Sequence, residues 1–124
     1  MILVDTSVWI DHLHRPEPGL VGLLEDDAVS CHPLVIQELA LGSIARRETL
    51  LRLLESLHAM PTLSHRELLS LIDARRLWGR GLSAVDVHLL GAVALVDGAR
   101  LWTRDKRLLA ACREVGIGVL QDPR

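Results

Sequence analysis

The chain has 124 residues, 49% of them hydrophobic, and its 14 Lys and Arg against 16 Asp and Glu give a net charge of −2. This length suits one domain with a real core but not two, so we expect residues 1–124 to form a single domain. The slightly negative charge excludes a protein that binds nucleic acid through overall basicity. The longest apolar run, residues 89–96, is too short to cross a bilayer.

The cysteines and the apolar composition indicate the setting in which the protein works. Cys31 and Cys112 are far apart and belong to no paired motif, so we expect reduced, packed thiols in a cytoplasmic protein. We see no signal peptide, because no basic segment precedes an apolar stretch. An apolar composition in so small a domain favours a surface hidden against a partner, and hence an oligomer or a complex.

The first residues combine a strand with an acidic residue. Ile2, Leu3 and Val4 form an apolar run typical of a strand that is buried on both faces of a parallel sheet. Asp5 follows at once, and the next residues are typical of the start of a helix. Asp5 would then stand at the carboxyl end of a strand, where open α/β sheets bind ligands. Simple capping of the next helix explains the same residue.

The rest of the chain alternates helical and extended patterns. We predict helices over residues 6–14, 20–25, 33–41, 84–96 and 106–115, with two Leu-rich helices between residues 43 and 78. We predict strands at residues 28–31, 100–103 and 118–120, and an extended segment at residues 59–63. Strands separated by helices indicate an α/β fold, in which a parallel-stranded central sheet carries helices on both faces.

Glu38 is an acidic residue in a nearly all-apolar helix. Burial of an unpaired carboxylate costs several kcal/mol, so this side chain needs a cation or must reach solvent. The surrounding helix is so apolar that we expect Glu38 to take part in a site. A polar stripe that Glu38 shares with Gln37 is the alternative.

Two further acidic residues stand where helices are predicted to begin. Asp86 follows Ser83 at the spacing of a capping box, although the usual acidic member of that motif is the longer Glu. Asp105 follows a predicted strand and occupies the natural N-cap position of the next helix. For both residues, capping and a functional role remain open.

Taken together, these acidic residues point to a metal site. Asp5, Glu38, Asp86 and Asp105 lie in places that a doubly wound sheet can bring to one crevice. Carboxylates gathered there repel one another, and a divalent cation removes that penalty. Oxygen ligands without a Cys or His motif select Mg²⁺ or Mn²⁺. Such ions lower the pKa of a bound water molecule, which can then attack a phosphate ester.

The motifs that carry these residues resemble those of the PIN-domain ribonucleases, and within them the VapC-type toxins of bacterial toxin–antitoxin pairs. They are Val4-Asp5-Thr6-Ser7-Val8-Trp9-Ile10-Asp11, Gln37-Glu38-Leu39, Asp86 and Thr103-Arg104-Asp105-Lys106-Arg107-Leu108. The resemblance implies a PIN-like three-layer sandwich and Mg²⁺-dependent endoribonuclease activity with a metal-activated water. It also implies a homodimer and a cognate VapB-like antitoxin that blocks the site.

Carried over onto this sequence, the resemblance assigns catalytic and metal-binding roles to the four acidic residues. Asp5, Glu38, Asp86 and Asp105 would form the metal-binding set, with Thr6 and Thr103 close to it as supports for metal-bound water. Helix starts also favour Thr, so a purely local role for both threonines remains open. We expect an antitoxin segment to bury apolar side chains against the N-terminal helices or the Leu-rich helices, and to project an Arg or Lys toward the carboxylates.

RNA contact would fall mainly on arginines, because the chain has no Phe or Tyr. Base stacking is limited to Trp9, Trp78 and Trp102, for each of which ordinary packing is the alternative. Arg104 and Arg107 beside the last motif are the first candidates for RNA phosphate contacts, and Arg80 is the next. Solvated or ion-paired surface positions explain the same three arginines.

Two other classes of protein also fit parts of the pattern. A phosphoacceptor signalling module is a small α/β protein with an acidic crevice, in which Lys106 would act as the late lysine. A non-catalytic partner-binding domain would use the acidic residues only as helix caps and surface charges.

Overall fold

A computed structural model describes residues 1–123 of the chain. Its strands are β1 (Ile2–Val4), β2 (Val29–Cys31), β3 (His58–Ala59) and β4 (Arg100–Trp102). Its helices are α1 (Thr6–His14), α2 (Pro18–Glu25), α3 (Pro33–Ala40), α4 (Arg47–Ser56), α5 (His65–Arg75), α6 (Ala84–Ala94) and α7 (Lys106–Val115). None of these helices is long and apolar enough to span a lipid bilayer.

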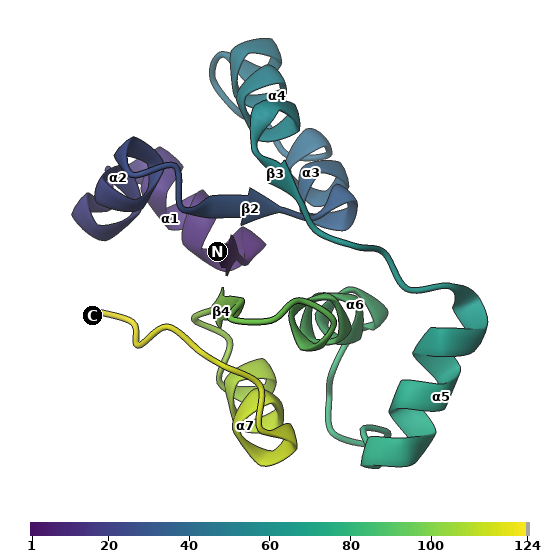
Figure 1. The fold of residues 1–124 in the computed structure, drawn as a ribbon. Coiled ribbons are helices and arrows are strands. Elements are labelled where there is room, and N and C mark those ends of the chain that lie inside the picture. The colour runs from purple at the N-terminus through teal and green to yellow at the C-terminus, as the bar shows by residue number, and fades with distance from the viewer. Residues whose placement is uncertain (124) are drawn as a thin grey trace.

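The strands form one parallel sheet in the order β3-β2-β1-β4. Strand β1 lies inside it, with Ile2 paired to Val29 on one side and to Arg100 on the other. Helices α1–α4 and α5–α7 lie on opposite sides of this sheet (Figure 1). The predicted fold class, an α/β three-layer arrangement around a parallel sheet, is therefore confirmed.

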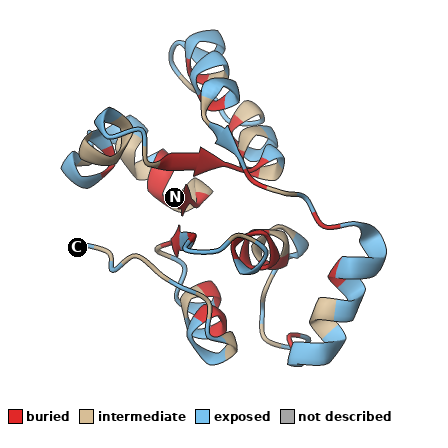
Figure 2. Ribbon diagram, viewed as in Figure 1, coloured by how far each residue is buried: buried red, intermediate tan, exposed pale blue. Residues whose placement is uncertain are grey.

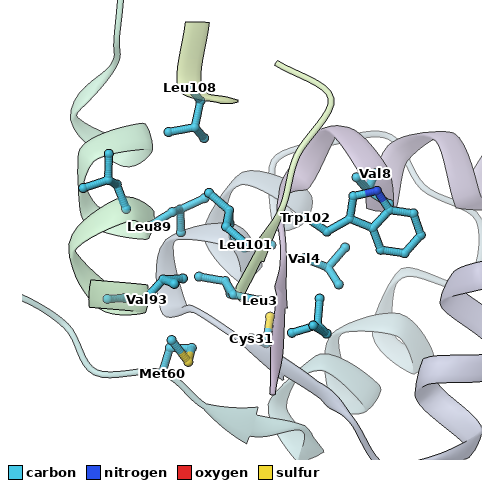
Figure 3. Close-up of a cluster of buried hydrophobic side chains, with 14 of the residues drawn as sticks. Leu3, Val4, Val8, Cys31, Met60, Leu89, Val93, Leu101, Trp102 and Leu108 are labelled. Atoms are coloured by element: carbon cyan, nitrogen blue, oxygen red, sulfur yellow. The ribbon is translucent and has the colours of Figure 1, made fainter. Parts of the chain in front are cut away.

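The core fills both faces of β1, as its continuous apolar run predicts. Leu3 and Val4 have no exposed surface, and they point to opposite faces because side chains alternate along a strand. Figure 3 shows Leu3 on the side of Leu89 from α6, and Val4 on the side of Val8 from α1. In Figure 2 the buried residues accordingly concentrate in β1, β2, β4 and α6, whereas β3 is exposed. A strand enclosed in this way fixes the position of the residue that follows it.

Several predicted boundaries differ from the structure. Helix α2 begins at Pro18 rather than at residue 20, because proline is favoured in the first turn and the Glu17 side chain caps the helix. The strand predicted at residues 118–120 is reduced to one bridge, between Leu101 and Val119. Of the extended segment predicted at residues 59–63, only Ala59 belongs to the sheet, as the last residue of β3.

His32 links the end of β2 to α3 and is fully buried. Its Nδ1 accepts a hydrogen bond from the backbone N–H of Leu34 at 3.0 Å and so caps α3. The ring faces His88 with 6.0 Å between centroids, and its Nε2 has no hydrogen-bond partner among the described residues. Burial, with a smaller effect from His88, lowers the pKa of His32 to about 4.

This buried imidazole makes stability depend on pH. The unfolded chain protonates His32 near its ordinary pKa of 6.5, whereas the folded protein does so only near 4, so the folded state loses stability as the pH falls between these values. His32→Asn keeps a capping oxygen but removes the titration. When the pH is lowered from 7 to 4.5, the unfolding free energy of the wild type should fall by about 2 kcal/mol more than that of the variant. Urea unfolding at both pH values would measure this difference.

The matched control is His65→Asn, because His65 is exposed at the start of α5. This control should keep the pH dependence of the wild type. Parallel losses of stability in the wild type and in His32→Asn would show that His32 does not set the acid sensitivity.

Candidate active site

Two of the predicted acidic residues, Asp5 and Asp105, follow the carboxyl ends of β1 and β4. Because the two strands are parallel neighbours, with Val4 paired to Trp102, the residues that follow them lie side by side. Asp5 donates its backbone N–H to the carbonyl of Trp102 at 2.9 Å. Thr103 donates its hydroxyl to Oδ2 of Asp5 at 2.7 Å. Chain segments 98 residues apart thus meet at one carboxylate.

Asp5 is the buried centre of this edge, with 6% of its surface exposed. It caps α1, accepting from the Thr6 backbone at 2.7 Å and from the Ser7 hydroxyl at 3.0 Å. Burial raises the pKa of Asp5, the nearby charge of Asp86 raises it further, and the hydrogen bonds from Thr103, Ser7 and Thr6 act in the opposite direction. None of the described Lys or Arg side chains forms an ion pair with Asp5.

Asp86 takes part in the capping of α6, and its charge also raises the pKa of Asp5. Its Oδ2 accepts from the Ser83 backbone at 2.9 Å and its own N–H donates to the Ser83 hydroxyl at 3.1 Å, so the capping box is formed. Among the described residues nothing donates to its Oδ1. Burial first, and then the charges of Asp5 and Asp86, raise the pKa of the Cys112 thiol to about 12. Both carboxylates therefore lie within electrostatic range of the same buried sulfur.

Asp105 caps α7 with one carboxylate oxygen. Its Oδ1 accepts from the backbone N–H groups of Arg107 at 2.9 Å and Leu108 at 3.1 Å. Its own backbone N–H donates to the Thr103 hydroxyl at 3.0 Å, which ties the residue to Asp5. No described residue donates a hydrogen bond to Oδ2 of Asp105.

Glu38 reaches the site, but the reason given for it from sequence is wrong. Both Glu38 and Gln37 are exposed, so the apolar helix does have a solvent-facing stripe, as the alternative stated. The Oε1 atom of Glu38 nevertheless accepts a hydrogen bond from the Thr6 hydroxyl at 2.7 Å. Because Thr6 also donates its backbone N–H to Asp5, Glu38 and Asp5 are joined through one residue.

The two threonines hold carboxylates in place. Thr6 donates to Glu38 and Thr103 donates to Asp5, both at 2.7 Å. Ser7 donates to Asp5 and accepts from the backbone N–H of Arg104 at 3.3 Å. Hydroxyl groups thus orient the acidic side chains.

Arg104 has partners other than the RNA phosphate expected from sequence. Its guanidinium binds Asp11 at 2.8 Å, Glu17 at 2.7 Å and Asp122 at 3.1 Å. It also lies over the Trp102 ring, 5.7 Å from the centroid, and its side chain is only 10% exposed. We therefore do not retain Arg104 as a phosphate contact. It holds α1, the segment before α2 and the C-terminal tail against the loop that carries Thr103.

The other two candidate arginines are more accessible. Arg80 forms an ion pair with Glu114 of α7 at 2.6 Å. Arg107 is exposed and forms no ion pair with any described residue. Of the three arginines, Arg107 is thus the one that has no carboxylate partner within residues 1–123.

The donor set fits a hard divalent cation. It consists of carboxylate oxygens next to hydroxyl groups, and the charge of Asp86 raises the pKa of the buried Asp5, a repulsion that a cation would relieve. Within residues 1–123, no group of three or more His, Cys, Asp or Glu side chains forms a ready metal site. An ion here would therefore need additional oxygen ligands, and Mg²⁺ usually keeps several waters.

Comparison with known proteins identifies relatives of the whole chain. The family model described as "PIN domain" matches residues 2–114. Ribonuclease VapC32 of Mycobacterium tuberculosis, from strains CDC 1551 and H37Rv, is 62% identical over 122 residues, which is 98% of this chain and 98% of the relative.

Solved structures share the fold at low sequence identity. PAE2754 from Pyrobaculum aerophilum matches with a TM-score of 0.62 and 21% identity, covering 89% of this chain and 83% of the other. A chain in the structure of FitAB bound to an IR36 DNA fragment matches with a TM-score of 0.58 and 16% identity, over 100% of both chains.

The Arg104 cluster should contribute to stability. In Arg104→Met, the carboxylates of Asp11, Glu17 and Asp122 lose their shared cation and repel one another. Because these carboxylates are partly solvated, we expect a loss of about 2–3 kcal/mol in unfolding free energy, below the value for a fully buried pair. Urea unfolding would measure it. Arg107→Met, with no ion pair to lose, should stay within about 0.5 kcal/mol of the wild type; equal losses would contradict the role of Arg104.

Proposed function

The chain belongs to the PIN-domain family, and on this basis we propose that it is a metal-dependent endoribonuclease that acts as the toxin of a bacterial toxin–antitoxin pair. Residues 1–124 would form one nuclease domain. The match of the family model over residues 2–114 and the full-length identity to a ribonuclease support this proposal. We place its action in the cytoplasm, where RNA is available.

The observation that carries the proposal is the state of Asp5. A carboxylate with 6% of its surface exposed, and with no cation from the described residues beside it, is costly for the folded protein. The nearby negative charge of Asp86 adds to this cost. Groups held in such an unfavourable state concentrate at functional sites. A cation that binds here would neutralise the carboxylate charge, and the repulsion that it relieves would contribute to its binding free energy.

We expect the carboxylates to bind the metal ion and the hydroxyl groups to orient the carboxylates. Asp5, Glu38, Asp86 and Asp105 would hold Mg²⁺ or Mn²⁺. When bound, such an ion lowers the pKa of a water molecule and offsets the charge of the reacting phosphate. Thr103 and Ser7 fix the Oδ2 atom of Asp5, and Thr6 fixes Glu38. The N-terminal ends of α1, α6 and α7 supply partial positive charge that favours a phosphate at this edge.

None of the nearby hydroxyl or thiol groups is placed to act as a nucleophile. The Ser7 hydroxyl donates to Asp5 and accepts from the backbone of Arg104, so its orientation is fixed by the protein. The Cys112 thiol is buried and its pKa is raised to about 12, which keeps it protonated. These two protein groups are therefore set aside, and we propose that a water activated by the metal ion would attack the phosphodiester.

An apolar groove beside Glu38 suits the antitoxin. Its volume is about 400 Å³, and residues of α1, of α3 and of the segment after α3 line it, among them Ile10, Leu39 and Glu38. A VapB-like antitoxin segment would bury apolar side chains here and direct an Arg or Lys toward the carboxylates. We also propose a homodimer, as the resemblance to the family implies. Helix caps at Asp5, Asp86 and Asp105 also fit a non-catalytic domain, but the 62% identity to a ribonuclease over 98% of the chain favours the nuclease over that alternative and over a phosphoacceptor module.

Removal of single carboxylates should abolish cleavage. Asp5→Asn and Asp86→Asn keep side-chain oxygens for capping but lose the charge, so each should reduce Mg²⁺-dependent RNA cleavage at least about 100-fold. The far-UV circular dichroism spectrum should be unchanged. Asp26→Asn, at the exposed end of α2, is the control and should cleave normally. Undiminished cleavage by both purified site variants would refute the assigned roles.

Metal binding should appear directly in thermal stability. Mg²⁺ bound only by the folded protein raises the melting temperature of the wild type as its concentration increases. Asp5→Asn should melt higher than the wild type without metal, because a buried charge and its repulsion with Asp86 are gone, and should respond much less to Mg²⁺. NaCl at matched ionic strength is the control. An equal Mg²⁺ response in both proteins would place the ion elsewhere.

A further inference from the structure

One large aromatic ring of this chain is available to another molecule. The sequence has three Trp and no Phe or Tyr. Trp9 and Trp102 are fully buried, whereas Trp78 is 61% exposed. Trp102 is also fixed by a hydrogen bond from its Nε1 to Asp122 at 3.2 Å. Trp78 is therefore the one tryptophan that can stack on a ligand from outside the protein.

Trp78 lies in the loop of residues 76–83, which leads from α5 to α6 (Figure 1). Leu77 beside it is buried, with 3% exposure, and anchors this loop to the core. Gly79 and Gly81 have positive φ values of 71° and 75°, a conformation that glycine adopts without strain. The loop ends in the capping box that contains Asp86, so its course is fixed at both ends.

The same loop touches the start of α7, where Asp105 lies. A Cβ atom built on Gly81 would stand 2.6 Å from Nη1 of Arg107 and 3.0 Å from its Cζ, so Gly81 packs directly on this guanidinium. Arg107 in turn donates its backbone N–H to Asp105. Trp78 is three residues from Gly81, at most about 11 Å of extended chain. The exposed indole thus belongs to a loop that ends at the capping box of Asp86 and packs on the side chain of Arg107, two residues from Asp105.

The charges around Trp78 suit a polyanion. Arg107 is exposed and has no ion pair among the described residues. Arg80 is paired with Glu114 and so stiffens the loop against α7. The loop that carries the exposed indole thus also packs, through Gly81, on a cation without an ion pair among the described residues, and an aromatic ring together with a cation is the combination that binds single-stranded nucleic acid.

We propose that the loop of residues 76–83 is a base-binding subsite of the nuclease, in which Trp78 stacks on an unpaired RNA base and Arg107 contacts a neighbouring phosphate. This inference rests on the proposed ribonuclease function and narrows its substrate to RNA that is single-stranded next to the cleavage point. Stacking requires an unstacked base, so the same sequence in a duplex is a poor ligand. The subsite positions the strand and leaves the chemical step to the carboxylates.

The first test compares kinetics on a short single-stranded RNA of mixed sequence. Trp78→Ala should raise KM about 10-fold or more, the usual effect of losing one stacked base, with little change in kcat. Trp78→Phe should restore most of the affinity because it keeps an aromatic face. Leu69→Ala is the matched control, since Leu69 is an exposed apolar residue of α5 outside the loop.

The second test uses the intrinsic fluorescence of the wild-type protein, with EDTA present to prevent cleavage. Stacking of a base on the exposed indole should quench emission when the single-stranded RNA is added, but not when the same RNA is annealed to its complement. Trp78→Phe should abolish this quenching, because the two remaining tryptophans are buried.

A third measurement tests the phosphate contact. In Arg107→Gln, the slope of the logarithm of the RNA binding constant against the logarithm of the salt concentration should become shallower by about 0.7, as expected for the loss of one phosphate contact.

The outcomes separate this subsite from the proposed function. A wild type that cleaves RNA, with Trp78→Ala equal to it in KM and affinity, would overturn the subsite alone. RNA-dependent quenching without cleavage in Mg²⁺ or Mn²⁺ would overturn the nuclease function and leave the subsite supported. A change of oligomeric state in Trp78→Ala, measured by analytical ultracentrifugation with RNA affinity unaltered, would assign Trp78 to a contact between two copies of the chain and overturn the proposal.

Discussion

The hydrogen bond from Thr103 to Asp5 is the interaction on which the site depends. It joins residues 98 positions apart at 2.7 Å, and it forms only because β1 and β4 are parallel neighbours with their carboxyl ends at one edge. Asp5 keeps its buried position through this bond and those from Thr6 and Ser7. The sheet thus supplies the position, and the hydroxyl groups supply the polar environment that a buried carboxylate requires.

The charge around the carboxyl ends of β1 and β4 differs between the side of Arg104 and the side of Arg107. On one flank Arg104 gathers Asp11, Glu17 and Asp122, which leaves an excess of negative charge and fixes the loop beside Asp5. On the other flank, the loop before α6 brings Gly81 against the exposed Arg107. An RNA strand would be repelled from the first flank and attracted to the second. Electrostatics therefore suggests the side from which a substrate enters, even though the chain as a whole is weakly acidic.

The features that could be predicted from the sequence are those that neighbouring residues determine. The apolar run before Asp5 and the helix of residues 6–14 were predicted with the bounds of β1 and α1, because burial and capping are properties of neighbouring residues. The partners of Arg104 could not be predicted, since they lie 18 to 93 positions away in sequence and follow no periodicity. Glu38 shows the opposite error: the apolar pattern suggested burial, but an eight-residue helix can expose one stripe.

Capping and catalysis were treated as alternatives for Asp86 and Asp105, yet the structure makes them compatible. A carboxylate has two oxygens, and each of these residues uses one on backbone N–H groups while no described residue donates to the other. Asp105 does so as the N-cap of α7, whereas Asp86 stands at the third helical position of α6 and reaches back to the Ser83 backbone. Ser or Asn would serve at the N-cap and Gln at the third position of a capping box without adding a negative charge, so Asp at both positions favours retention of the charge for ligand binding over stability.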